Sequence, residues 1–159
     1  MPEDHIRLSV PADTRYARLA RLTAASLAGR DGFTYDEVED VRIAVSEACA
    51  LLLGGPLTAD DGLDDLGGLA SGGFDEAGRP SPLDDPTFDG GDDPLDRLDV
   101  ELTTGNGELA VVLRRPAHET PATTDLSEQI LAAVLDSYEF SRDDRGGAVV
   151  RLVKRHASA

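Results

Sequence analysis

The chain has 159 residues, of which 40% are hydrophobic, and its 31 acidic and 15 basic side chains give a formal net charge of −16. This length corresponds to about one domain on the usual scale of ~100 to 200 residues. The negative charge disfavours nucleic acid as a partner, because such binding depends on Lys and Arg neutralising phosphates. No segment approaches the ~18 apolar residues of a membrane span, so we expect a cytoplasmic protein that binds neither nucleic acid nor membrane.

The acidic residues are concentrated in residues 54–96, which hold twelve acids and one arginine, a net charge of −11. The same segment has ten glycines and five prolines, and it offers too little apolar surface to offset the entropy of ordering it. We therefore predict a disordered acidic insertion within a single domain of residues 1–159. Its Asp89–Asp93 run lacks the alternating ligands and distal Glu of a helix-loop-helix calcium site, so a solvated loop is favoured and no metal site is predicted.

The N-terminal part of the chain predicts a strand and two helices. Residues 5–10 alternate apolar and polar side chains, the period of a half-buried strand. A helix capped by Asp13 or Thr14 then reaches Gly29, and Thr34 with Glu37 forms a capping box that begins a second helix ending at Gly54. One face of the first helix is formed by Tyr16, Leu19, Leu22, Ser26 and Leu27. The core side of the second is formed by Val38, Val41, Val45, Ala48 and Leu52.

Two hairpins and a third helix are predicted after the acidic segment. Residues 98–104 and 108–115 alternate well and are joined by Gly105-Asn106-Gly107, which tolerate positive φ. Asp125 and Glu128 cap a helix reaching about Asp136, and residues 138–142 and 148–154 form the last hairpin. The inward side of the third helix is formed by Leu126, Ile130, Ala133 and Val134. This order suits an α+β two-layer sandwich, a mostly antiparallel sheet with helices on one face.

Three stretches carry a family resemblance: Val10-Pro11-Ala12, Arg21-Leu22-Thr23, and the run from Phe33 to Cys49. They resemble the anti-sigma-factor serine kinases of bacterial general-stress and sporulation control, which belong to the superfamily of Hsp90, histidine-kinase and gyrase ATPases. Residues 5–53 carry the strong part of the match, and residues 98–155 match in the order of their elements. The resemblance implies a histidine-kinase/Hsp90-like ATPase fold, a homodimer, and a sigma factor or anti-anti-sigma protein as partner.

The resemblance also implies a magnesium-ATP site, and this chain departs from its pattern in three places. Glu47 fits the family's glutamate that acts as base or orients water, but the metal-binding Asn four residues later is replaced by Leu51, which offers Mg²⁺ no oxygen. Residues 114–119 replace the Asp-x-Gly-x-Gly loop that reads adenine, and Asp125-Leu126-Ser127 replaces the glycine loop that cradles phosphates. We therefore predict a degenerate member with no confident nucleotide-binding residue and neither ATP nor magnesium as cofactor.

Several alternatives remain open. The first is an active ATP-dependent serine/threonine kinase that phosphorylates an anti-anti-sigma protein, with Arg114, Arg115 and Glu119 replacing the lost contacts. The second is a structural dimer whose insertion binds divalent cations. Glu47 has an alternative of its own, a partly buried carboxylate bonded to a strand hydroxyl.

The favoured function is that of a regulatory pseudo-kinase acting by protein–protein contact. Arg15, Arg18 and Arg21 on the first helix form one basic patch, which suits steering toward an acidic partner. The alternative for each is a solvated helix face. The acidic insertion either competes with a partner for this patch or keeps the protein soluble.

The remaining candidates for site chemistry are histidines and one cysteine. His5, His118 and His156 lack the paired spacing of zinc ligands, so we expect surface histidines. Cys49 lies in an apolar helical pattern, where a free cysteine usually acts as a small core residue.

Overall fold

The computed structural model describes residues 3–54, 96–116 and 123–157. The described strands are β1 (Asp4–Pro11), β2 (Arg97–Gly105), β3 (Glu108–Arg115), β4 (Ser137–Arg142) and β5 (Ala148–Arg155). The described helices are α1 (Thr14–Arg30), α2 (Tyr35–Leu53) and α3 (Asp125–Val134). The predicted acidic insertion lies, except for its two end residues, outside the described residues.

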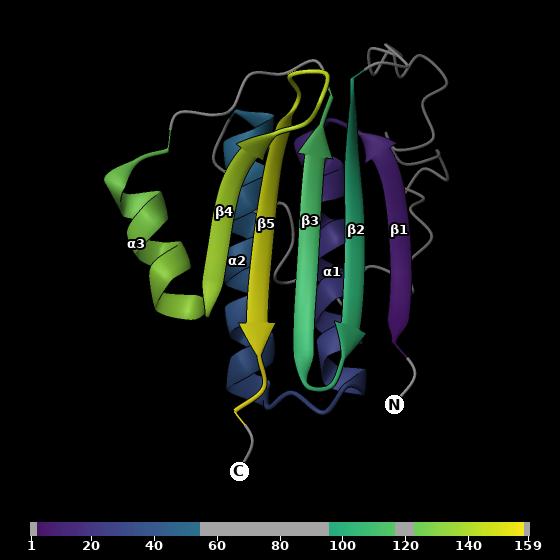
Figure 1. Ribbon diagram of the computed structural model, residues 1–159, viewed down its shortest axis with the longest axis vertical. Coiled ribbons are helices and arrows are strands. Elements are labelled where there is room, and N and C mark those ends of the chain that lie inside the picture. The colour runs from purple at the N-terminus through teal and green to yellow at the C-terminus, as the bar shows by residue number, and fades with distance from the viewer. Residues whose placement is uncertain (1–2, 55–95, 117–122, 158–159) are drawn as a thin grey trace, which may run out of the picture.

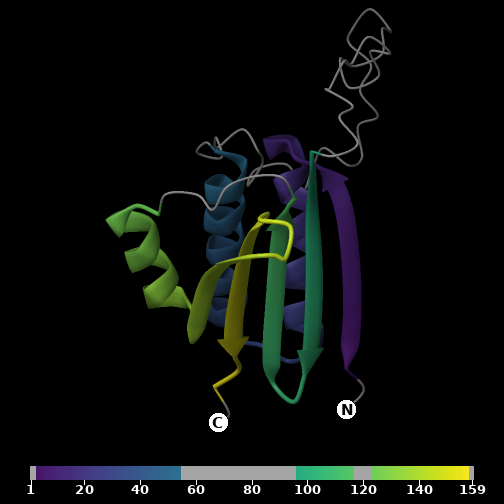
Figure 2. The same ribbon diagram turned by 45° about the horizontal axis from the view of Figure 1, so that its top comes forward.

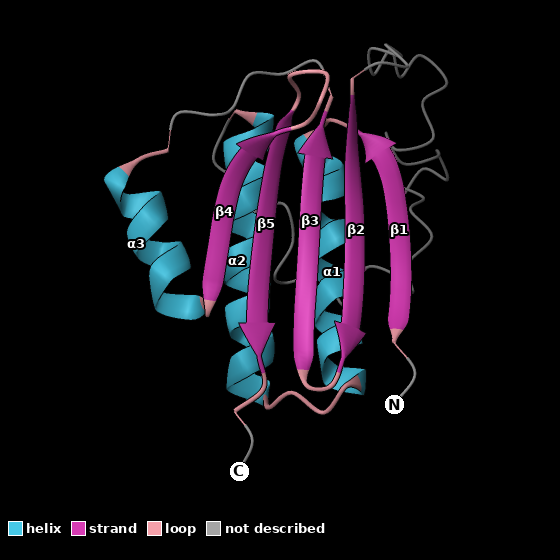
Figure 3. Ribbon diagram, in the orientation of Figure 1, coloured by secondary structure: helices cyan, strands magenta, loops and turns pink. Residues whose placement is uncertain are grey.

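The five strands form one sheet in the order β1-β2-β3-β5-β4, and every neighbouring pair is antiparallel. α1 and α2 lie side by side on one face of this sheet, and α3 stands beside β4 at one edge (Figure 1 and Figure 3). The turned view in Figure 2 shows the same two layers and the same place for α3. The predicted α+β two-layer sandwich is confirmed.

The core lies between the sheet and the helices α1 and α2. β2 and β3 bury alternate residues, so one face of each strand packs on the helices while the other faces away. Leu98, Leu102 and Leu113 on this inner face are fully buried, and enclosing each contributes about 1.5–3 kcal/mol to stability. The predicted core side of α2 is confirmed, since its members from Val41 to Leu52 are buried and Val38 packs against them.

The predicted apolar face of α1 is confirmed only for Leu27, because the helix buries a row of alanines instead of Leu19 and Leu22. Of the five residues predicted to share one face, only Leu27 is buried, while Leu19 and Leu22 are 46% and 37% exposed. The buried row is formed by Ala17, Ala20, Ala24 and Ala28. Alanines at this helical spacing let α1 approach the sheet and α2 closely, so the leucine row is turned outward.

The predicted inward face of α3 is confirmed for Val134, which packs against the core, but it is wrong for Leu126 and Ala133. Ser127 and Leu131 are the buried residues, whereas Leu126 is 65% exposed and Ala133 is exposed. The helix is capped by Thr124, not by Asp125: the Thr124 hydroxyl accepts the Ser127 N–H at 3.1 Å. With this cap, the helix begins with the Ser127 side chain facing the core. The helix ends at Val134, two residues before the predicted Asp136.

The turn between β4 and β5 is packed against the end of β3. A Cβ added at Gly147 would lie 3.0 Å from the Cα of Pro116 and 3.2 Å from the carbonyl oxygen of Arg115. It would also lie 2.8 Å from the carboxylate of Asp143, whose oxygen accepts the Gly147 N–H at 2.7 Å. Because two of these neighbours are backbone, the position requires glycine for lack of space.

We expect Gly147→Ala to lower the free energy of unfolding by about 1–3 kcal/mol through overpacking. Gly29→Ala is the matched control, because no atom lies within 4 Å of its added Cβ and alanine in a helix is favoured over glycine by about 0.5–1 kcal/mol. Chemical denaturation of both variants measures the difference. Equal stability of Gly147→Ala and the unchanged protein would contradict this packing.

Candidate functional site

Glu47 and Leu51 lie on α2, whose start is fixed by the predicted capping box. The Thr34 hydroxyl accepts the Glu37 N–H at 3.3 Å, and the Glu37 carboxylate accepts the Thr34 N–H at 2.7 Å. Glu47 and Leu51 are both half-buried, and their spacing of four residues places them on one flank of the helix. Within the described part of the chain the Glu47 carboxylate has no hydrogen-bond partner, so the bond to a strand hydroxyl is not found there.

Asp40 shows which way this flank points. It precedes Glu47 by seven residues, close to two helical turns, so the two share a flank. The Lys154 amine on β5 donates to the Asp40 carboxylate at 2.8 Å and to the Val134 carbonyl at 2.9 Å, where α3 ends. The Glu47 flank of α2 therefore faces α3 and β5.

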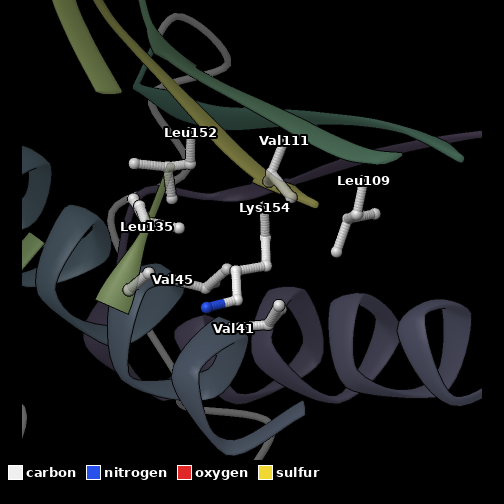
Figure 4. A pocket seen from close by; sticks show the side chains of 8 residues that line it. Val41, Val45, Leu109, Val111, Leu135, Leu152 and Lys154 are labelled. Atoms are coloured by element: carbon white, nitrogen blue, oxygen red, sulfur yellow. The ribbon is translucent and has the colours of Figure 1, made fainter. Parts of the chain in front are cut away.

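A small cavity lies between α2 and the sheet beside this ion pair. Its volume is about 10 Å³, which is room for about one water molecule. In Figure 4 the amine of Lys154 lies close to Val41 and Val45 of α2. The other lining residues are Ala44, Leu109, Val111, Leu135 and Leu152. This cavity is far smaller than the ~300–1,000 Å³ of a typical ligand pocket, so it does not hold a nucleotide base.

Arg115, at the end of β3, is a buried cation that joins three segments. Its guanidinium donates to the Leu52 carbonyl at 2.6 Å and to both carboxylate oxygens of Asp96 at 3.0 and 3.1 Å. Leu52 lies in the last turn of α2, and Asp96 precedes β2. One guanidinium therefore joins the two described ends of the chain that flank residues 55–95, and these protein groups occupy its donors.

Arg114 points to the opposite face of the sheet from the helices. Its guanidinium donates to the Glu101 carboxylate at 3.2 Å, and the same carboxylate lies 2.8 Å from the His5 imidazole and 3.4 Å from the Arg7 guanidinium. The hydrogen bond with His5, supported by those from Arg114 and the charge of Arg7, lowers the pKa of Glu101. A triphosphate on the Glu47 flank of α2 is thus out of reach of Arg114, and Glu119 lies outside the described residues.

The three arginines predicted to form a patch on α1 have different surroundings. Arg15 makes a two-point ion pair with the N-cap Asp13, at 3.0 and 2.8 Å, and the hydrogen bond within it lowers the pKa of Asp13. Arg21 turns toward α2 and donates to the Ser46 hydroxyl at 3.2 Å. Arg18 has no ion pair with any described residue. We name the surface formed by the exposed Arg15, Leu19 and Leu22 with the half-buried Arg18 the α1 outer face.

Glu37 has a second role that the sequence did not indicate. Beyond its capping box, it accepts the Ala157 N–H at 2.7 Å and lies 2.8 Å from the His156 imidazole. Burial by itself raises the pKa of Glu37, but the N–H groups of Ala157 and Thr34, with the His156 and Thr34 side chains, lower it to about 2. One carboxylate therefore binds the start of α2 to the end of β5.

Among the histidines and the cysteine, His5, His156 and Cys49 lie in the described part of the chain. His5 and His156 each contact a carboxylate, whereas His118 lies outside the described residues. No cluster of three potential metal ligands occurs among the residues that the structure describes. Cys49 is fully buried, and burial raises its pKa to about 12, as expected for a core residue.

None of the described helices is both long enough and apolar enough to cross a bilayer.

Known proteins match one part of this chain. A 46-residue segment, 29% of this chain and 29% of the relative, is 54% identical to the serine-protein kinase RsbW of Bacillus subtilis strain 168. The identity is 50% to the RsbW of Bacillus velezensis and 48% to that of Bacillus cereus strain AH187, over the same length. The resemblance to the anti-sigma-factor serine kinases is confirmed. The matched part spans less than a third of each relative, and no family model matches the chain.

The low pKa of Glu37 predicts an acid-sensitive contribution to stability. Its pKa is 4.5 ordinarily and about 2 in the folded protein, so the contribution is complete above about pH 4.5 and is lost as the pH falls toward 2. We expect Glu37→Gln to reduce the free energy of unfolding by about 1.5–3 kcal/mol at neutral pH. This loss should disappear near pH 2.

Denaturation of both proteins across this pH range measures the effect. Glu39→Gln is the control on the same helix, because its half-exposed pair with Arg42 is worth only about 0.3–0.5 kcal/mol. The two proteins should differ in their free energy of unfolding at neutral pH and not near pH 2. If this difference stayed constant down to about pH 2, it would contradict the low pKa assigned to Glu37.

Proposed function

We propose that this chain is a regulatory protein of the anti-sigma-factor, partner-switching type, which acts by protein–protein binding and has a degenerate ATP site. The observation that carries the proposal is Leu51, four residues after Glu47 on the flank of α2 that faces α3. Its half-buried side chain packs against the core. Mg²⁺ takes oxygen ligands in near-octahedral geometry, and a leucine at the place of the family's metal-binding Asn supplies none.

The start of α3 supports the same proposal. A helix N-terminus binds phosphate when its free N–H groups meet the anion. Here Thr124 already satisfies the Ser127 N–H, and Asp125 with Glu128 place two negative charges in the first turn. These carboxylates repel a phosphate at the end where the family resemblance implies a phosphate-cradling loop.

The contacts of Arg115 are a third observation that supports the proposed degenerate ATP site. It stands where the resemblance implies the start of the adenine-reading loop, and it holds the Leu52 carbonyl and Asp96. Releasing the guanidinium from these partners would cost about 1.5–3 kcal/mol, the usual value of hydrogen bonds to a charged group. Its engagement with the protein argues against a role in phosphate binding.

The α1 outer face is the proposed binding surface for a sigma factor or an anti-anti-sigma protein. Leu19 and Leu22 supply exposed apolar area beside Arg15 and Arg18, and such a combination is typical of the buried anchors of protein interfaces. Arg21 is removed from the predicted patch, since its guanidinium reaches the Ser46 hydroxyl between the two helices. The preferred partner surface is acidic with apolar side chains, and the functional unit is a homodimer.

An active serine/threonine kinase is the second candidate function. It is favoured by Glu47, which stays on the family's helix, half-buried and without a described partner that would occupy its carboxylate. In this case the chain transfers the γ-phosphate of magnesium-ATP to a serine of an anti-anti-sigma protein. The two candidates differ in whether nucleotide is needed for partner binding.

Binding of the cognate sigma factor in nucleotide-free buffer tests the proposal. We expect a stable complex without ATP, and we expect Arg18→Glu to weaken it by at least about tenfold, equivalent to ~1.4 kcal/mol. Arg145→Glu in the β4–β5 turn makes the same charge change away from α1 and should leave the affinity unchanged. Titration calorimetry gives each dissociation constant. A complex that forms only with magnesium-ATP, or that tolerates Arg18→Glu, would contradict the proposal.

A further inference from the structure

α1 is the most basic of the described helices, although the whole chain has a net charge of −16. Its 17 residues include four arginines and no acidic side chain. The first turn of a helix is partly positive because of its free N–H groups, and the sequence places Arg15 in that turn and Arg18 directly after it. The beginning of α1 is therefore a positive region to which acidic groups are attracted.

The α1 outer face presents these charges beside apolar side chains. The Arg15 side chain is 46% exposed even with its ion pair to Asp13, and Arg18 is half-buried. The exposed Leu19 and Leu22 lie about one and two helical turns beyond Arg15. Cations next to apolar area are complementary to an acidic segment that carries an aromatic or apolar side chain.

One end of the acidic segment is attached to the described chain beside the start of α1. The Ala12 N–H donates to the Asp96 carbonyl at 3.0 Å, and Pro11 pairs with Arg97 on β2. Ala12 precedes Thr14, the first residue of α1, by two positions. The residues that come just before Asp96 therefore join the described chain next to the first turn of α1.

The part of the segment nearest to this attachment has the complementary chemistry. Residues 83–93 carry five aspartates and no basic side chain, and the aspartates lie on both sides of Phe88. Phe88 precedes Asp96 by eight residues, which span up to ~26 Å when extended. Because a helix rises ~1.5 Å per residue, Leu22 lies only ~12 Å beyond Thr14 along the axis of α1. Phe88 is thus within reach of the apolar side chains of the α1 outer face.

We propose that residues 83–93 bind the α1 outer face of the same chain and compete there with the regulatory partner. Phe88 packs on Leu19 and Leu22, and the aspartates around it pair with the arginines of that face. Of the two roles that the sequence leaves open for the acidic insertion, this assigns competition. The inference deepens the proposed function, on which it rests for the identity of the competing partner.

The covalent connection makes even a weak contact an effective competitor. A ligand tethered by a short stretch of chain has an effective concentration of about 1 mM at its site. At that concentration, a contact with a dissociation constant of ~0.1 mM would lower the apparent affinity of the partner about tenfold. Exposed ion pairs are individually weak and are screened by salt, so a partner with a larger interface displaces the segment.

Disulfide formation within the full chain tests the contact without any partner. Ser26→Cys places one thiol on the exposed side of α1, and Thr87→Cys places the other next to Phe88. In the matched control, Ser141→Cys on β4, also exposed, takes the place of Ser26→Cys. Cys49 is fully buried, so it stays out of the reaction.

Under mild oxidation we expect the first pair to form a disulfide within a single chain at least about fivefold faster than the control pair. The difference should vanish in about 1 M salt, where the screening length falls to ~3 Å. Equal rates for the two pairs at low salt would overturn the contact.

Binding of the cognate sigma factor to the full chain provides the second measurement. One variant changes the five aspartates of residues 83–93 to asparagine. The control variant makes the same change in net charge elsewhere in the acidic segment, at Asp60, Asp61, Asp64, Asp65 and Asp75. At low salt we expect the first variant to bind at least about threefold more tightly than the unchanged protein, and the control variant to bind as the unchanged protein does.

Equal affinity of the two variants would overturn the competition. A protein that binds no sigma factor without nucleotide would contradict the proposed function, whereas the cross-linking rates need no partner and decide the contact by themselves. The two failures are therefore distinguishable.

Discussion

The buried guanidinium of Arg115 is the contact on which the rest of the domain depends. It is 9% exposed, and it binds the last turn of α2, the start of β2 and, through its own backbone, the end of β3. Without it the Leu52 carbonyl and the partly exposed Asp96 would lose a charged partner, at a cost of about 1.5–3 kcal/mol. It also joins the two described ends of the chain that flank residues 55–95.

The close packing of the two long helices has a functional consequence. The alanine row of α1 fits against the sheet and α2, so the larger Leu19 and Leu22 are turned to the surface. Those leucines, with Arg15 and Arg18, form the α1 outer face that we propose as the partner-binding surface. Because the alanines of α1 fill the core side of the helix, Leu19 and Leu22 remain at the surface and are available for binding.

Local rules predicted the elements well because their signals lie within a few residues. The capping box of Thr34 and Glu37, the Asn106-Gly107 turn with its positive φ values, and the alternation of β2 and β3 are all found as expected. Which face of a helix is buried was less predictable. The sequences of α1 and α3 each contain more than one row of apolar residues, and the contacts of the folded protein bury a row that differs from the predicted one.

The contacts of the candidate site could not be predicted from the sequence, because they join segments that lie far apart along the chain. Lys154 and Arg115 did leave a signal, since each continues the inward-facing period of its strand with a basic residue in place of an apolar one. Such a residue needs a buried partner, but its identity, Asp40 or Asp96, depends on the register of the whole sheet. The second role of Glu37, with Ala157 and His156, left no comparable pattern.

Isothermal titration with ATP and ADP, with and without Mg²⁺, tests most directly whether this scaffold has become a binding module. The account predicts no heat of binding up to millimolar nucleotide under either condition, because Leu51 offers the metal no ligand and the first turn of α3 carries Asp125 and Glu128. Micromolar binding that depends on Mg²⁺ would contradict it and would make the serine kinase the leading account of this protein.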